Sequence, residues 1–224
     1  MSGARASGEE AAVTIPHGGD DLASLFARNR AWASAKIDAD PGFFSRLVGQ
    51  QRPRYFWIGC SDSRVPATEI VDLDPGEMFV HRNVANLAVA SDPNFSAALQ
   101  FAIEALEVQH IIVVGHYDCG GIQAAMAPRT EDAIGAWLDP VRALYRGQAG
   151  GAASDDPRHL CECNVVAQVE ALARNPIVRN AWERGAALAL HGWVYAIGDG
   201  LLRSVCDPVT NGEGSEGPVQ AASS

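Results

Sequence analysis

Apolar residues along this chain follow two patterns that alternate with each other. Short runs that are apolar at nearly every position predict strands buried on both faces, and stretches with apolar residues three or four apart predict helices. Alternation of the two indicates an α/β fold, a mostly parallel central sheet flanked by helices, with an N-terminal helical arm. The predicted strands are 55–59, 78–84, 111–115 and 188–197, and the predicted helices are 22–40, 96–107, 133–145 and 164–173.

The two ends of the chain lack this periodicity. Residues 1–19 are rich in glycine, alanine and serine, and the segment 207–224 reads DPVTNGEGSEGPVQAASS. Such composition predicts disordered tails at both ends. The remaining segment, 20–206, is expected to form one compact domain, because a chain of 224 residues with 47% hydrophobic content can bury a sizeable core.

The balance of charges excludes several classes of partner. The chain has 17 Lys and Arg against 27 Asp and Glu, a formal net charge of −10. This charge repels phosphate backbones and anionic lipids, so we expect no nucleic-acid partner and no membrane partner. Apolar runs stay below the roughly 18 residues of a spanning helix, and Glu9 and Glu10 lie where a signal peptide is apolar. We therefore expect a cytoplasmic protein.

Polar clusters follow two of the predicted strands and contain three good zinc ligands. Cys60, Asp62 and Arg64 come directly after the first strand, and His116 and Cys119 come after the third. The carboxyl ends of parallel strands meet at one edge of a sheet, where ligands bind in α/β folds. A His-x-x-Cys spacing alone is more typical of buried residues, but a Cys-x-Asp-x-Arg at a matching strand end favours a zinc site.

Four segments resemble successive motifs of the β-class carbonic anhydrases. They are CSDSR at 60–64, RNVAN at 82–86, GHYDCGG at 115–121 and HGWVY at 191–195, and the resemblance covers roughly 22–205 in family order. It implies a zinc enzyme that interconverts carbon dioxide and water with bicarbonate and a proton by attack of zinc-bound hydroxide. It also implies a homodimer or a dimer of dimers with active sites along the subunit interface.

The resemblance assigns a role to each residue that matches a family motif. The zinc ligands fall on Cys60, His116 and Cys119. Asp62 and Arg64 match the family's catalytic pair, in which the arginine holds the aspartate off the metal. The positions that match residues around the substrate are Gln51, Phe79, Val84 and Phe101.

One subgroup of the family has a second, non-catalytic bicarbonate site that acts as a switch. Trp57, Arg82 and Tyr195 match its three positions. In that subgroup, Asp62 would leave Arg64 and become a fourth zinc ligand at low pH or high bicarbonate. Packing or an ion pair explains each of the three residues taken singly, whereas the three together favour the switch.

Two other functions fit the same ligands. The scaffold could hydrolyse carbon disulfide or carbonyl sulfide, or it could be a bicarbonate-sensing or structural zinc protein closed permanently by Asp62. Arg64 and Gln51 disfavour a closed site, because a purely structural four-ligand zinc needs neither. Asp118 departs from the family pattern, since many relatives have glycine or a small residue there. The remaining cysteines are interpreted as buried, interface or incidental thiols, and they are Cys161, Cys163 and Cys206.

Overall fold

The computed structural model describes residues 22–147 and 155–211. The tail expected at 1–19, and the part of the C-terminal tail beyond residue 211, lie outside these ranges. The chain divides into two units, of which the first ends at Gly49 and the second begins at Gln50. Each unit is described by itself.

The described part of the N-terminal unit consists of two helices, α1 (Leu22–Ala39) and α2 (Phe43–Leu47). Trp32 of α1 meets Phe43 and Phe44 of α2 edge-on, with ring centroids 6.4 and 5.6 Å apart. The predicted N-terminal helix is therefore confirmed. Its large apolar side chains stay exposed, and these are Leu22, Leu25, Phe26, Trp32 and Ile37.

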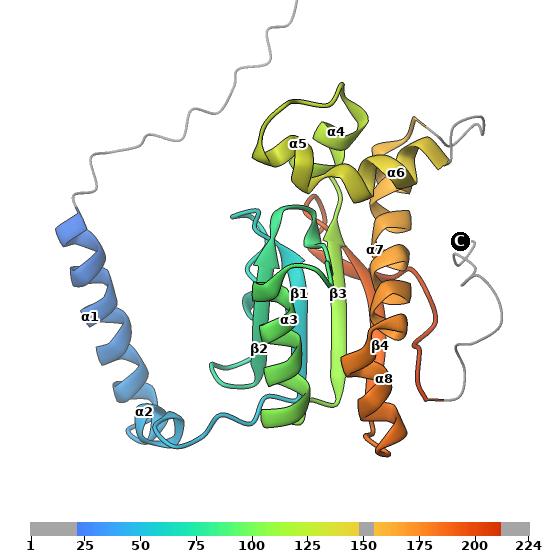
Figure 1. Ribbon diagram of the computed structural model, residues 1–224. Coiled ribbons are helices and arrows are strands. Elements are labelled where there is room, and N and C mark those ends of the chain that lie inside the picture. Colours follow the sequence, from blue (N-terminus) through green and yellow to red (C-terminus); the bar gives the residue numbers. More distant parts are fainter. Residues whose placement is uncertain (1–21, 148–154, 212–224) are drawn as a thin grey trace, which may run out of the picture. The chain divides into compact units, whose positions relative to one another are not determined.

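The second unit is built on a five-stranded sheet in the order β2-β1-β3-β4-β5 (Figure 1). The first four strands pair in parallel, as predicted, and β5 lies antiparallel to β4 at one edge. The hydrophobic pattern did not predict β5, a short strand whose side chains are largely exposed. The strands are β1 (Tyr55–Cys60), β2 (Met78–Asn83), β3 (His110–His116), β4 (Ala189–Ala196) and β5 (Leu201–Ser204).

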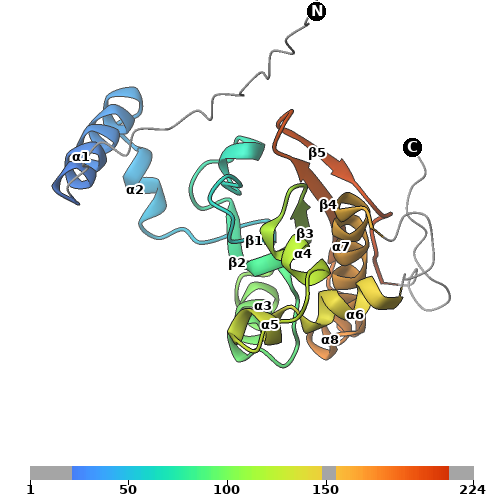
Figure 2. The same cartoon turned by 90° about the horizontal axis from the view of Figure 1, so that it is seen from above.

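Three helices cover one face of this sheet, and all begin in the same way (Figures 1 and 2). In each, an Asp or Asn at the N-cap accepts a hydrogen bond from the backbone two residues on, and proline occupies the first turn. Both features stabilise a helix start. The expected helix at 96–107 is shorter, because a π-helical turn, η3 (Phe101–Ala105), follows α3. The helices are α3 (Pro93–Gln100), α7 (Pro157–Arg174) and α8 (Pro176–Glu183).

The opposite face of the sheet is covered by the segment that follows β1, which includes the short helix η1 (Glu69–Val71). This face has its own buried cluster, separate from the main core between the sheet and the three helices. The buried members of this smaller cluster are Trp57, Val65, Ala67, Ile112, Val114 and Tyr195.

Three short helices follow the carboxyl end of β3 and complete the unit. The pattern at 133–145 corresponds to two helices rather than one. Val209 is buried and pairs with Leu190 of β4, so the ordered chain extends past the expected boundary at 206. No helix within the described ranges is both long and apolar enough to cross a membrane. The three helices are α4 (Gly120–Met126), α5 (Ala133–Trp137) and α6 (Asp139–Gly147).

Candidate metal centre

The sheet brings the two predicted polar clusters to one edge. Cys60 is the last residue of β1 and His116 the last of β3, and these neighbouring strands run parallel. Cys119 lies one turn further, directly before α4. Asp118 has a φ of 58°, a left-handed conformation that Asp tolerates better than most residues. The aspartate is therefore compatible with a tight turn for which glycine is the easiest choice.

The three ligand atoms form a compact, buried group. The sulfur, sulfur and imidazole nitrogen all lie within 4.8 Å of one another, and the sulfurs of Cys60 and Cys119 are 3.8 Å apart. Two sulfurs bound at about 2.3 Å in a tetrahedral zinc shell are separated by about 3.8 Å. The Nδ1 of His116 donates to the carbonyl of Tyr117 at 2.9 Å, and the buried Nε2 has no hydrogen-bond partner. The residues therefore fit a zinc ion.

The two thiols differ in their ionisation. Pairing with Cys119 and the nearby imidazole of His116 lower the pKa of Cys60. The same pairing raises the pKa of Cys119, because the two sulfurs compete for one proton. Deprotonated sulfur is the form that binds a metal, so the lowered pKa favours the ligating form of Cys60.

Asp62 lies beside this group and is held by Arg64. The Nε and Nη2 atoms of Arg64 donate to the two carboxylate oxygens of Asp62 at 2.9 and 2.7 Å. This bidentate pair holds the pKa of Asp62 well below its usual range. Arg64 also donates to the carbonyl of Asp118, and the Oδ2 of Asp62 is 3.7 Å from the Nε2 of His116. The predicted pair is thus in contact, next to the ligand atoms.

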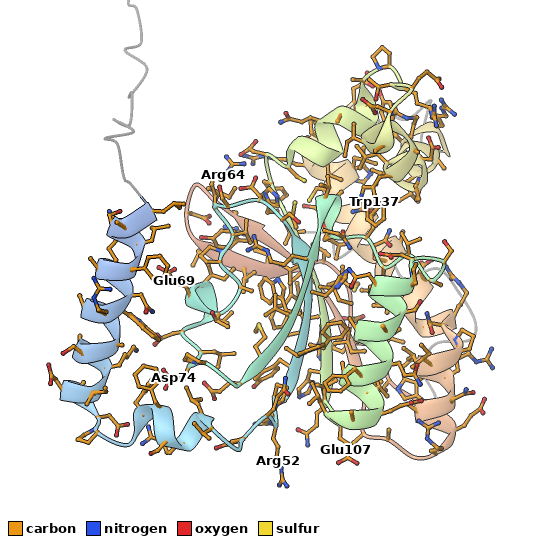
Figure 3. All side chains as sticks on the ribbon, turned by 60° about the vertical axis from the view of Figure 1, so that its left-hand side comes forward. Arg52, Arg64, Glu69, Asp74, Glu107 and Trp137 are labelled. Carbon is orange, nitrogen blue, oxygen red and sulfur yellow. The ribbon has the colours of Figure 1, made fainter. Side chains whose placement is uncertain are left out.

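The predicted substrate residues separate into two groups. Val84 lies in the turn η2 (Val84–Asn86), directly after β2 and against the first turn of α4. Gln51 precedes β1, at the end of the strand opposite Cys60, and six strand residues span about 20 Å. Figure 3 shows the neighbouring Arg52 and Arg64 at opposite ends of the sheet. One copy of the chain therefore does not bring Gln51 to the ligands.

The two predicted phenylalanines lie together, also away from the ligands. Phe79 is the second residue of β2, and the strand continues to Asn83, which is the register partner of Cys60. Phe101 begins η3, and its ring centroid is 5.9 Å from that of Phe79. Phe101 remains 47% exposed. Within one chain the pair is therefore separate from the ligand cluster.

The three residues matched to the bicarbonate site lie on one face of the sheet. Trp57 is fully buried, and its indole Nε1 has no hydrogen-bond partner. A Cβ on Gly59 would collide with that nitrogen, so glycine makes room for the indole. Arg82 donates to the backbone carbonyls of Cys60 and Asp62. Tyr195 belongs to the same buried cluster as Trp57.

Sequence reasoning missed a set of polar contacts from α7 to the loops that carry the ligands. The Sγ of the buried Cys161 donates to the carbonyl of His116 at 3.2 Å, and Asn164 donates to that of Ala85. Cys161 was predicted only to be buried, which the structure confirms. A signal for this set exists, because the buried polar positions 161, 164 and 168 recur at helical spacing on one face. Cys206 is not incidental, since it is buried against Gly192.

Comparison with known proteins identifies the family. A family model described as carbonic anhydrase matches residues 55–202. A carbonic anhydrase of Emericella nidulans is 41% identical over 186 residues, which is 81% of this chain and 82% of that protein. A carbonic anhydrase of Pseudomonas aeruginosa is 36% identical over 168 residues, which is 71% of this chain and 76% of that protein.

Solved structures agree with the sequence comparisons. The β-carbonic anhydrase of Coccomyxa, in complex with acetazolamide, has a TM-score of 0.81 and 38% identity, covering 85% of this chain and 89% of that one. A structure from work on two tetrameric β-carbonic anhydrases of Sordaria macrospora has a TM-score of 0.78 and 34% identity, covering 84% and 98%. The chain therefore belongs to the carbonic anhydrase family. Within that family, its fold and its cysteine-histidine-cysteine cluster are those of the β class.

Proposed function

We propose that this protein catalyses the reversible hydration of carbon dioxide at a zinc ion held by Cys60, His116 and Cys119. The observation that carries the proposal is the fit of the ligand atoms, with sulfurs 3.8 Å apart and a buried, unpartnered Nε2. When bound, zinc supplies hydroxide near neutral pH by lowering the pKa of a coordinated water. The remaining steps depend on the side chains around it.

Asp62 and Arg64 supply the orientation that the reaction needs. The carboxylate of Asp62 is ionised at neutral pH, because Arg64 holds its pKa well below the usual range. An ionised carboxylate can only accept hydrogen bonds, so Asp62 would accept one from hydroxide supplied at the metal site and would orient it toward carbon dioxide. Arg64 keeps both carboxylate oxygens engaged and thereby holds Asp62 beside the metal rather than on it.

A second copy of the chain would complete the substrate pocket. Gln51, Phe79 and Phe101 do not reach the ligands of their own chain, and Phe101 is 47% exposed. We infer that these residues face the ligand cluster of a neighbouring copy in a homodimer, where the rings form a dry wall and Gln51 donates to substrate. The exposed apolar side chains of α1 and the tetrameric enzymes of Sordaria macrospora support such assembly, as a dimer or a dimer of dimers.

The bicarbonate switch is a further part of the proposal. The unpartnered Nε1 of Trp57 is a buried donor that an anion would satisfy, and Arg82 bonds the backbone of Asp62. Bicarbonate bound among Trp57, Arg82 and Tyr195 would draw Arg82 away from the carbonyl of Asp62. Asp62 would then leave Arg64 and ligate the metal, and its Oδ2 is already 3.7 Å from the Nε2 of His116. Activity should then be sigmoidal with pH and inhibited by bicarbonate. Trp57→Ala should remove this cooperativity, and an unchanged profile would refute the switch.

Stopped-flow measurement of carbon dioxide hydration tests the main proposal. Zinc-quantified protein should show rapid hydration between about pH 6.5 and 9, the range in which a zinc-bound water ionises. Cys60→Ser should reduce hydration to background. Cys206→Ser is the control, because Cys206 is also a buried free thiol but does not belong to the ligand cluster, and this variant should retain hydration. Zinc-loaded protein without hydration even at the alkaline end would refute the proposal and direct the assay to carbon disulfide and carbonyl sulfide.

A further inference from the structure

Two helices that contribute no metal ligand hold the turn η2 by hydrogen bonds. The indole Nε1 of Trp137, the last residue of α5, donates to the carbonyl of Val84 at 2.8 Å. The Nδ2 of Asn164 in α7 donates to the next carbonyl, that of Ala85, at 3.0 Å. Figure 3 shows Trp137 at the same end of the sheet as Arg64. Successive carbonyls of one turn are thus fixed from two separate elements.

The backbone of η2 needs this support. Ala85 has a φ of 66° and Asn86 a φ of 50°, the left-handed conformation that costs free energy in residues other than glycine. The intrinsic backbone preferences of Ala85 and Asn86 therefore do not stabilise this turn. Asn164 is itself fixed, because its Oδ1 accepts from the Nε2 of Gln168 at 3.1 Å, and the Oε1 of Gln168 accepts from the backbone of Ala88 at 2.9 Å. Asn164 and Ala85 are fully buried.

The turn η2 in turn contacts the elements that carry the metal ligands. A Cβ on Gly121 would lie 2.9 Å from the Cγ1 of Val84 and 3.1 Å from the Cβ of Ala85. The first turn of α4, which begins directly after Cys119, therefore rests on η2. On the other side, the carbonyl of Asn83, which directly precedes η2, accepts a hydrogen bond at 3.0 Å from the backbone N–H of Ser61, the residue after Cys60.

We propose that Trp137 and Asn164 are positioning residues of the metal centre. They hold the carbonyls of Val84 and Ala85 so that the backbone beside Cys60 and the turn bearing Cys119 have a fixed support. The inference rests on the proposed zinc site. Partners of metal ligands typically account for about 10- to 100-fold in metal affinity, which sets the size of the effect.

A matched pair of tryptophan substitutions tests the proposal. Trp137→Phe keeps an aromatic ring but removes the donor to Val84. Trp182→Phe is the control, because its Nε1 makes an equivalent 2.8 Å bond to the carbonyl of Leu188, at the start of β4 and away from η2. The measurements are zinc affinity, by competition with a chromophoric chelator, and the thiolate-to-metal charge-transfer band of the cobalt-substituted protein.

Trp137→Phe should weaken zinc affinity about tenfold and shift the charge-transfer band, because the ligands beside a loosened η2 no longer meet the metal in the parent geometry. Trp182→Phe should leave both at the parent values. Asn164→Leu, of similar size but without a donor, should weaken zinc affinity in the same direction and decides the matter if Trp137→Phe does not fold. Variants at 137 and 164 that match Trp182→Phe in both measurements would overturn the proposal.

These measurements separate the inference from the proposed activity. Neither zinc affinity nor the cobalt spectrum depends on turnover of carbon dioxide. A parent protein that binds zinc, shows the shifted band in Trp137→Phe and does not hydrate carbon dioxide would refute the proposed function and support the positioning role. A parent that hydrates carbon dioxide, with Trp137→Phe and Asn164→Leu behaving like Trp182→Phe, would support the proposed function and refute the positioning role.

Discussion

The strand β3 begins and ends with a histidine, and its two ends have different chemistry. At the start, the Nδ1 of His110 lies 3.1 Å from the Nε2 of His191, and its ring stacks on Tyr55 with centroids 5.7 Å apart. At the end, His116 is fully buried, and its Nε2 has no hydrogen-bond partner and faces the sulfurs of Cys60 and Cys119. One histidine is satisfied by a neighbour, and the other keeps a lone pair available.

The difference teaches what distinguishes a metal ligand from a structural histidine. Both are partly or fully buried and both lie on the same strand, so burial and secondary structure do not separate them. What separates the two histidines is the group that lies beside each imidazole. His110 has the imidazole of His191 as its neighbour, whereas His116 lies beside two thiols, and pairing between them lowers the pKa of Cys60. Thiolate and imidazole together are a donor set that zinc prefers.

The largest expected effect comes from replacing each histidine in turn. His116→Asn removes one of three ligands, so zinc content should fall well below one per chain and hydration should fall to background. His110→Asn should retain both, because His110 faces only His191 and Tyr55. Zinc analysis and stopped-flow hydration on the two variants check this, and equal zinc loss in both would contradict the assignment of the site.

Arg64→Ala should have the next largest effect. Without the guanidinium, the carboxylate of Asp62 loses two hydrogen bonds and is free to move toward the ligand atoms. Its Oδ2 is 3.7 Å from the Nε2 of His116. Zinc content should stay at the parent level, while hydration should fall about 100-fold, the usual size for a displaced proton acceptor. The contradicting result is zinc loss in parallel with activity, which would make Arg64 a structural residue.

Adjacent glycines at the start of α4 allow a matched test of packing at the metal end. Gly121→Ala would place a Cβ 2.9 Å from the Cγ1 of Val84, whereas a Cβ at Gly120 would meet no atom within 4 Å. Overpacking typically costs about 1–3 kcal/mol, so Gly121→Ala should lower the free energy of unfolding by that amount. Gly120→Ala should leave it unchanged or slightly higher. Urea titrations compare the two, and equal stabilities would show that η2 moves aside freely.

The cysteine-histidine-cysteine cluster could be predicted from sequence because each of its members lies at or just after the end of a continuous apolar run. Cys60, His116 and Cys119 follow continuous apolar runs, and parallel strands that end in polar residues bring those residues to one edge. The same reasoning could not find Trp137, which reaches Val84 across 53 positions through a single side-chain-to-carbonyl bond. Such a bond has no period and no spacing, so the one-dimensional pattern does not contain it.

The fold shows the same contrast between features that the sequence pattern predicts and features that it does not. The buried strands β1 and β3 were predicted within one residue at each end, because every position is apolar and no other element explains the run. The exposed edge strand β5 was missed, and the helix expected at 96–107 ends in a π turn. The assignment of Gln51 to the substrate stays a prediction, because one chain places this residue at the end of β1 opposite Cys60.

The smallest expected effect concerns the histidine pair at the start of β3. Burial lowers the pKa of both imidazoles, and the charge of Arg54 lowers that of His110 further. The unfolded chain therefore binds more protons than the folded one as pH falls below about 6.5, so the free energy of unfolding should decrease with falling pH. His191→Asn should make this decrease shallower, since one of the two buried imidazoles is gone.

Tyr55→Leu is the matched control for that measurement, because it removes the stacked ring and keeps both imidazoles. It should lower the unfolding free energy by a similar amount at about pH 7.5 and about pH 5.5, leaving the slope of the parent. The comparison with the parent cancels the contribution of the metal ligands, which all three proteins share. A slope in His191→Asn equal to that of the parent would mean that the pair titrates alike in both states, and that β3 differs at its two ends only in metal chemistry.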